Sequence, residues 1–185
     1  VALGYQACND LTTGNNNTSV GKFAMHSNTI AGNNTAVGSG SLYSNETGTD
    51  NIAMGINSGY LCTGSNNTIL GGSAGRTVTS GGENTFVGMQ AGYSTSGGVD
   101  SNTFIGCNSG YHMTTGYNTI VGRFTGNEDS LDIRSTSNNV VLADGGGNVK
   151  LHILQNDNAN FRGDIQITAS SKAIGSARIG LKYQT

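Results

Sequence analysis

Proline and tryptophan are missing from this chain, and aromatic residues make up only 6% of its 185 positions. Hydrophobic residues of all kinds reach 35%, whereas there are 30 glycines. This composition excludes an ordinary globular core, because so little apolar material must offset the entropy lost when so many glycines are ordered. A regular repeat, or burial between chains, resolves the shortage.

Charge is also scarce. Charged residues make up 11% of the chain, and the formal net charge is −2. A nearly neutral chain lacks the electrostatic footprint of a nucleic-acid-binding protein. Low charge also differs from typical disorder, which combines low hydrophobicity with high net charge. Since no apolar run approaches the roughly 18–20 residues needed to span a bilayer, we expect no membrane insertion.

The residues that carry most enzyme chemistry are few and scattered. A polysaccharide depolymerase needs paired carboxylates in a groove, and the acidic residues of the repeat occur singly. One acidic cluster exists, formed by Glu128, Asp129 and Asp132, and its spacing favours a solvated loop over a Ca²⁺ site. We therefore predict that the chain is not an enzyme and that it holds no cofactor and no metal.

The three cysteines are an odd number, at Cys8, Cys62 and Cys107. They fall at different positions of the repeat described next. We interpret them as small buried hydrophobic residues, not as disulfides or metal ligands.

What the sequence does contain is one phrase, Asn-Thr-x-aliphatic-Gly, that recurs about every 17 residues. The glycines of this motif are Gly4, Gly21, Gly38, Gly55, Gly71, Gly88, Gly106 and Gly122. A unit of this length is too short for a pair of helices and suits one coil of a β-solenoid or β-roll. We predict an all-β fold of about eight coils over residues 1–127, which gives a rod roughly 35–40 Å long at a strand spacing of about 4.8 Å.

Residues at one fixed distance from the motif glycine form a column through successive repeats, and the residue type of each column suggests its role. The residue before the glycine is always aliphatic or Met, which predicts a core stack: Leu3, Val20, Val37, Met54, Leu70, Val87, Ile105 and Val121. The residue four before it is always Asn, so the side-chain amides can form a ladder from coil to coil. The residue three before it is mostly Thr, which we expect to point inward with the aliphatic stack.

The residue two before the glycine belongs to the opposite face of the strand, because strand side chains alternate. From the fourth motif onward this position is large and apolar: Ile69, Phe86, Phe104 and Ile120. A solvated face does not carry two phenylalanines on consecutive coils. We therefore predict that these four residues pack between chains of a homo-oligomer.

A tyrosine column lies five residues after the glycine, at Tyr43, Tyr60, Tyr93 and Tyr111. Tyrosine offers an apolar face and a hydroxyl group at low entropic cost. These rings are candidates for receptor binding, with sugar rings lying on them. The alternative is that they pack at turns or at chain interfaces.

Periodicity fades after Gly126, and residues 128–185 are expected to form a C-terminal non-repetitive β module. The run "NVVLADGGGNVKLHILQ" predicts a hairpin with a glycine-rich connection. The stretches "FRGDIQIT" and "SARIGLKYQ" predict further strands.

The phrase "NTAVGSGSLYSNETGTDN" (34–51) resembles repeats of phage tail fibres and of related bacterial surface proteins, and the core of the motif is similar to the heads of trimeric autotransporter adhesins. The run "NNVVLADGGGNVKL" (138–151) is similar to the stretch that often follows such repeats, ahead of an intramolecular chaperone domain. The resemblance implies an extracellular homotrimeric fibre, on a virion tail or a cell surface. Several coils depart from the family by replacing Ala-Leu with Ala-Gly-Tyr or Ser-Gly-Tyr.

The leading functional hypothesis is a structural fibre segment that mediates attachment to a host cell surface through a glycan or protein receptor. The alternative is an ice-binding β-solenoid, since the motif places one Thr on most coils. Inward-pointing threonines would disfavour that alternative.

Overall fold

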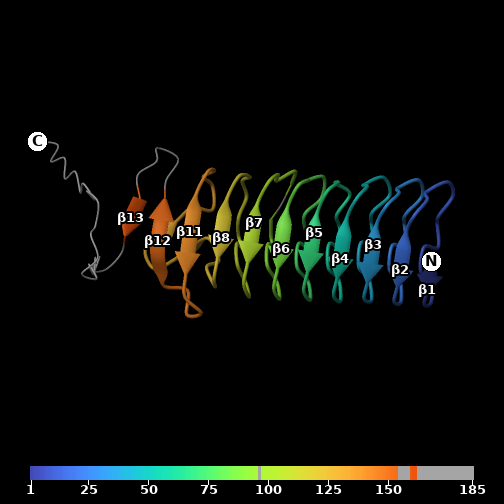
Figure 1. Cartoon of the computed structure of the whole chain (residues 1–185), viewed down its shortest axis with the longest axis horizontal. Coiled ribbons are helices and arrows are strands. Elements are labelled where there is room, and N and C mark those ends of the chain that lie inside the picture. Colours follow the sequence, from blue (N-terminus) through green and yellow to red (C-terminus); the bar gives the residue numbers. More distant parts are fainter. Residues whose placement is uncertain (96, 154–158, 162–185) are drawn as a thin grey trace, which may run out of the picture.

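A computed structural model describes residues 1–95, 97–153 and 159–161, and it shows an all-β solenoid without helices in these ranges. The coils follow one another along a rod (Figure 1). The strands are β1 Ala2–Leu3, β2 Thr18–Val20, β3 Thr35–Val37, β4 Ile52–Met54, β5 Thr68–Leu70, β6 Thr85–Val87, β7 Thr103–Ile105, β8 Thr119–Val121, β9 Asn127–Glu128, β10 Leu131–Asp132, β11 Val140–Ala143, β12 Val149–Ile153 and β13 Ala159–Phe161. The predicted β-solenoid of about 17 residues per coil is confirmed.

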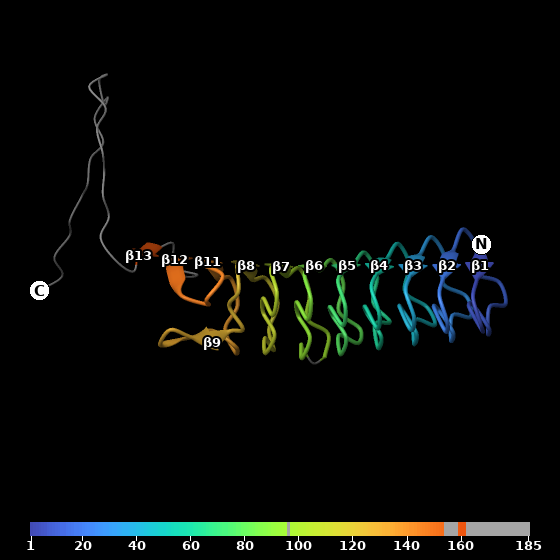
Figure 2. The same cartoon turned by 90° about the horizontal axis from the view of Figure 1, so that it is seen from below.

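One continuous sheet runs the length of the rod. Strands β1 to β8 pair in parallel with their sequence neighbours, and equivalent motif positions lie opposite each other, as in Phe86 beside Phe104. The strands lie along one side, and the turns that complete each coil project from the other (Figure 2). Each coil therefore contributes one strand to a flat outer face and one set of turns to the opposite side.

The motif glycine forms the corner where the strand ends. At Gly88 the φ angle is +131°, and a Cβ atom there would lie 2.5 Å from the carbonyl oxygen of Gly106 on the next coil. No side chain fits such a close approach of two backbones, and the conformation is one that glycine adopts readily. This explains why the glycine recurs in every coil of the repeat.

The asparagine ladder predicted from the motif is present. Its members are buried, and each accepts a hydrogen bond at Oδ1 from the backbone N–H of the next asparagine, as Asn67 does from Asn84 at 3.1 Å. The side-chain amide of Asn84 in turn donates to Asn67 Oδ1 and to the carbonyl of Val99. The ladder thus satisfies backbone groups at a corner that the strand pairing does not reach.

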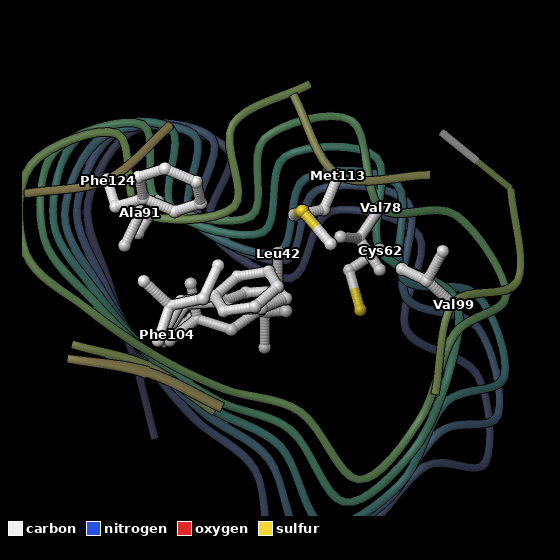
Figure 3. Close-up of a cluster of buried hydrophobic side chains, with 14 of the residues drawn as sticks. Leu42, Cys62, Val78, Ala91, Val99, Phe104, Met113 and Phe124 are labelled. Carbon is white, nitrogen blue, oxygen red and sulfur yellow. The ribbon is translucent and has the colours of Figure 1, made fainter. Parts of the chain in front are cut away.

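Two columns of side chains pack against each other in the interior of the rod, and their sizes compensate. Other buried residues, such as Val78 and Met113, lie beside them (Figure 3). We call the residues two before each motif glycine the strand column and those four after it the turn column. In the second and third coils the strand column is small, with Ser19 and Ala36, and the turn column supplies buried Met25 and Leu42.

In the sixth and seventh coils the two columns exchange roles. Phe86 and Phe104 occupy the strand column and stack at 5.2 Å between ring centroids, and the turn column holds Gly92 and Gly110. A Cβ atom at Gly92 would lie 2.9 Å from the Phe86 ring. Viewed along the rod, Leu42 and Phe104 occupy the same part of the cross-section, although they belong to different coils (Figure 3).

The fourth coil joins the two kinds of packing. Both of its column residues are small, Ala53 and Gly59. The space is taken by neighbours, because a Cβ atom at Gly59 would lie 3.0 Å from Ile69 Cδ1 and 3.1 Å from Leu42 Cδ2. Side chains from the coils on both sides therefore fill this coil.

The parallel stacking ends at a hairpin. β11 pairs in parallel with β8, and then β12 and β13 add in antiparallel fashion. The predicted hairpin is confirmed by the pairing of β11 with β12, which covers residues 140–153. A short pair, β9 with β10, lies below this end of the sheet (Figure 2). Most of "FRGDIQIT" and all of "SARIGLKYQ" lie outside the described residues, so the predicted module of 128–185 is described only at its start.

Candidate functional site

The outer face of the sheet is formed by the residues that flank the strand column. One outward column is aliphatic and the other is mostly Thr. The aliphatic column predicted as a core stack lies on this surface: Leu3 is 66% exposed, Met54 44% and Ile105 40%. The prediction that this column points into the core is wrong. Side chains alternate along each three-residue strand, so the second residue points inside the coil and the first and third point outside.

The four residues predicted to pack between chains lie inside their own chain. Ile69, Phe86, Phe104 and Ile120 are all 0% exposed in the single chain and belong to one core cluster. The interpretation of these residues as an inter-chain contact is therefore wrong. The turn column explains the burial, since glycines there leave room for large strand residues on the same coils.

The threonines share the outward direction of the aliphatic column, contrary to the inward orientation we expected. Thr35, Thr68 and Thr103 are partly exposed in strands whose middle residue is buried. Position 52 replaces Thr by Ile, which is 43% exposed. Strands β2 to β8 contain no charged residue, so the outer face there is uncharged.

The tyrosine column forms a ladder of stacked side chains along the turn side. His26 stacks on Tyr43 and Tyr43 on Tyr60, with centroids 5.0 and 4.8 Å apart and rings 10° from parallel. The guanidinium group of Arg76 lies 5.5 Å from the Tyr60 ring centroid and 5.8 Å from that of Tyr93.

Tyr93 stacks on Tyr111 at 4.9 Å, which continues the ladder. All four predicted receptor-binding tyrosines are half-buried, and their ring faces cover one another. A sugar ring lying on each tyrosine needs a free face, so this geometry supports the packing alternative.

The three cysteines are free and differ in burial. Cys62 is buried, and burial raises the pKa of its thiol to about 11. Cys8 is partly buried against the core, whereas Cys107 is exposed. The interpretation as buried hydrophobic residues holds for Cys62 and is wrong for Cys107, which follows the corner glycine and points outside.

The acidic cluster near residue 130 is divided among separate partners. Arg134 forms a bidentate contact with Asp132, and its side chain lowers the pKa of that carboxyl group. Glu128 lies 3.8 Å from the Arg123 guanidinium, and Asp129 accepts a hydrogen bond from the backbone of Val149. Among the described residues no three His, Cys, Asp or Glu side chains converge as metal ligands.

Comparison of the chain with family models, curated proteins and solved structures found no match. No helix in the described ranges has the length and apolar character needed to cross a membrane. The candidate surfaces are the uncharged outer face, the stacked ladder and a hollow on the corner that precedes strands β5 to β8.

Proposed function

We propose that this chain is a segment of a homotrimeric fibre that attaches to a host cell surface, and that the outer face of the sheet is where the three copies meet. The observation that carries the proposal is the exposed aliphatic column. Its members are exposed on five of the strands from β1 to β8 and partly exposed at Val20, Leu70 and Val87, and the column continues at Leu142 of β11, which is 41% exposed. Single exposed aliphatic residues are normal, but a continuous apolar stripe marks an interaction surface.

The geometry of this face suits identical partners. Nine strands at a spacing of about 4.8 Å give a stripe about 38 Å long. A second copy laid alongside presents the same columns at the same interval, so one good contact is repeated at every coil. The face also carries no charge on β2 to β8 that would have to be desolvated.

The number of copies follows from the resemblance of the repeat to homotrimeric fibres. In a trimer each chain meets two others, and the outer faces surround a shared axis. The turn sides, rich in hydroxyl and amide groups, then face outward. An extracellular fibre of this kind contacts its receptor through those sides and needs no catalysis, cofactor or metal.

Light scattering tests the proposal directly. The chain has a mass of 18.9 kDa, and three times that value is expected in solution. The double variant Val37→Lys/Ile105→Lys places two charges on the outer face and should yield a folded monomer. Leu61→Lys is the matched control, because Leu61 is exposed to the same degree as Val37 (37% and 36%) but lies on the turn side.

Leu61→Lys should remain trimeric. A wild-type monomer would contradict the fibre proposal. If the double variant stayed trimeric, the outer face would not be the contact surface.

A second candidate function is ice binding, which the outward orientation of the threonines favours. A flat array of Thr side chains on parallel strands presents a repeated pattern of hydroxyl and methyl groups. The array here is interrupted at Ile52, and its aliphatic partners vary from Val to Met, so the surface is uneven. Clear thermal hysteresis at micromolar protein would displace the fibre proposal in favour of this one.

A further inference from the structure

A hollow opens on the corner of the rod that precedes the strands, beside the outer face and not on it. It has a volume of about 400 Å³ and crosses the coils of β5 to β8. Its polar and aromatic lining includes Ser65, Asn66, Ser80, Glu83, Asp100 and Tyr117. Four rungs at about 4.8 Å make the hollow roughly 14 Å long, which suits an extended ligand.

Tyr117 supplies a free aromatic face at one end of this hollow. Its side chain is 61% exposed, and within the described residues its ring stacks on no other ring. This distinguishes it from the four tyrosines of the stacked ladder. The apolar face and the hydroxyl group of such a ring match the alternating C–H and O–H groups of a sugar.

Two carboxylates provide hydrogen-bond acceptors in the same hollow. Ser101 Oγ donates to Glu83 Oε2 at 3.0 Å, and the backbone N–H of Gly82 donates to Asp100 Oδ1 at 2.8 Å. Each contact engages one oxygen of its carboxylate and leaves the other, Oε1 of Glu83 or Oδ2 of Asp100, for a ligand. Charged acceptors form strong hydrogen bonds with hydroxyl donors.

The charge of the hollow selects among ligands. None of the four ion pairs in the described part of the chain involves Glu83 or Asp100. Two negative charges without a neighbouring cation repel an acidic polysaccharide and accept hydroxyl groups. We propose that this hollow binds a neutral oligosaccharide, with one sugar ring on Tyr117 and hydroxyl groups on Glu83 and Asp100. The site deepens the proposed function, since it would give the fibre its contact with a surface glycan.

Isothermal titration of the full chain with four pentasaccharides tests the site. The neutral probes are maltopentaose, cellopentaose and N-acetylchitopentaose, and the acidic probe is pentagalacturonate. At least one neutral probe should bind, and the acidic probe should not. Binding of the acidic probe alone, or of none of the four, would overturn the proposal.

Variants can be chosen that other coils already tolerate. Tyr117 has a φ angle of +63°, and the same corner holds Asn at positions 16, 33 and 66. Tyr117→Asn should therefore preserve the fold and weaken neutral-probe binding at least tenfold. Asp100→Asn keeps the acceptor for Gly82 and should weaken binding several-fold.

Tyr5→Asn is the matched control. Tyr5 is also exposed (65%), but it follows β1 and therefore lies far from the hollow, which spans the coils of β5 to β8. It should leave the affinity unchanged. Equal loss in Tyr5→Asn and Tyr117→Asn would remove Tyr117 from the site. Release of reducing ends from a bound probe would show a hydrolase and overturn the binding role.

The binding test and the oligomer test can fail independently of each other. A trimer that binds no probe retains the fibre and loses the site. A monomer that binds a neutral probe through Tyr117 retains the site and loses the fibre.

Discussion

The two halves of the rod have the same backbone and opposite interiors. In the coils of β2 and β3 the turn side fills the core with Met25 and Leu42, whereas in the coils of β6 and β7 the strand side fills it with Phe86 and Phe104. The asparagine ladder and the corner glycines do not change between the halves. The shape of the coil is therefore set by the asparagine and glycine positions. The core side chains can vary as long as the strand and turn columns together fill the same volume.

The largest effect is expected from emptying either core. Phe86→Ala should lower the free energy of unfolding by about 3–5 kcal/mol, and Leu42→Ala by about 2–5 kcal/mol, because each leaves a cavity among buried neighbours. Chemical denaturation monitored by circular dichroism measures both. A loss below about 1 kcal/mol in only one half would show that the two interiors are not equally packed.

The asparagine ladder should not distinguish the halves. Asn51→Ala and Asn84→Ala each leave a buried backbone N–H and carbonyl without their partners, and each should cost about 2–3 kcal/mol or more. Asn15→Ala is the control, because Asn15 is exposed and lies outside the ladder, and it should cost less than about 0.5 kcal/mol. Unequal costs at Asn51 and Asn84 would mean that the ladder carries different strain in the two halves.

Converting one kind of coil into the other sharpens the comparison further. Gly92→Leu alone should destabilise by about 1–3 kcal/mol, because the new side chain meets the Phe86 ring. Leu42 adopts a φ angle of +48° at the equivalent position, close to the +60° of Gly92, so the backbone accepts leucine there. In Phe86→Ala/Gly92→Leu the new leucine fills the vacated space, and a favourable coupling of about 1–2 kcal/mol is expected from a double-mutant cycle. Simple additivity would contradict the volume exchange.

The smallest effect concerns the hairpin that ends the stack and belongs to neither half. Asp144 accepts hydrogen bonds from Asn148 and from the N–H of Gly146, and Lys150 lies 3.1 Å from it. These contacts, led by the side chain of Asn148, lower the pKa of Asp144.

A lowered pKa means that the stabilising contribution is present above the unfolded value near pH 4 and is lost as the pH falls through the folded value. Asp144→Asn should therefore reduce the thermal midpoint slightly at pH 7 and flatten its dependence below about pH 4. Thermal melts from pH 7 to pH 2 provide the measurement. An unchanged acid slope in the variant would assign the pH dependence to other carboxylates.

The sequence predicted the coil, its length, the asparagine ladder and the end hairpin, because these depend on residues that must recur at fixed spacing. It did not yield the direction of the strand faces. Thr, Phe and Val alternate at 85–87, and alternation alone permits either face to be the inside.

The signal that decides the direction was in the turn column, where glycine appears whenever the strand column is large. Gly75, Gly92 and Gly110 follow Ile69, Phe86 and Phe104 by six residues each. The same exchange accounts for the departure of these coils from the Ala-Leu form of the repeats that the sequence resembles. The hollow at Tyr117 was out of reach, because it joins side chains from four different coils.

The coil with Ala53 and Gly59 limits how such arrays can be rearranged. Gene duplication, deletion or recombination can move whole coils freely within a run of one kind, because each neighbour then has the same shape. A rearrangement that places a coil like that of Leu42 directly beside a coil like that of Phe86 would remove the coil of Ala53 and Gly59. That coil has small residues in both columns, and side chains from both neighbours fill its space. Viable length variants of this chain should therefore keep that coil at the boundary, or change both columns of a neighbouring coil at the same time.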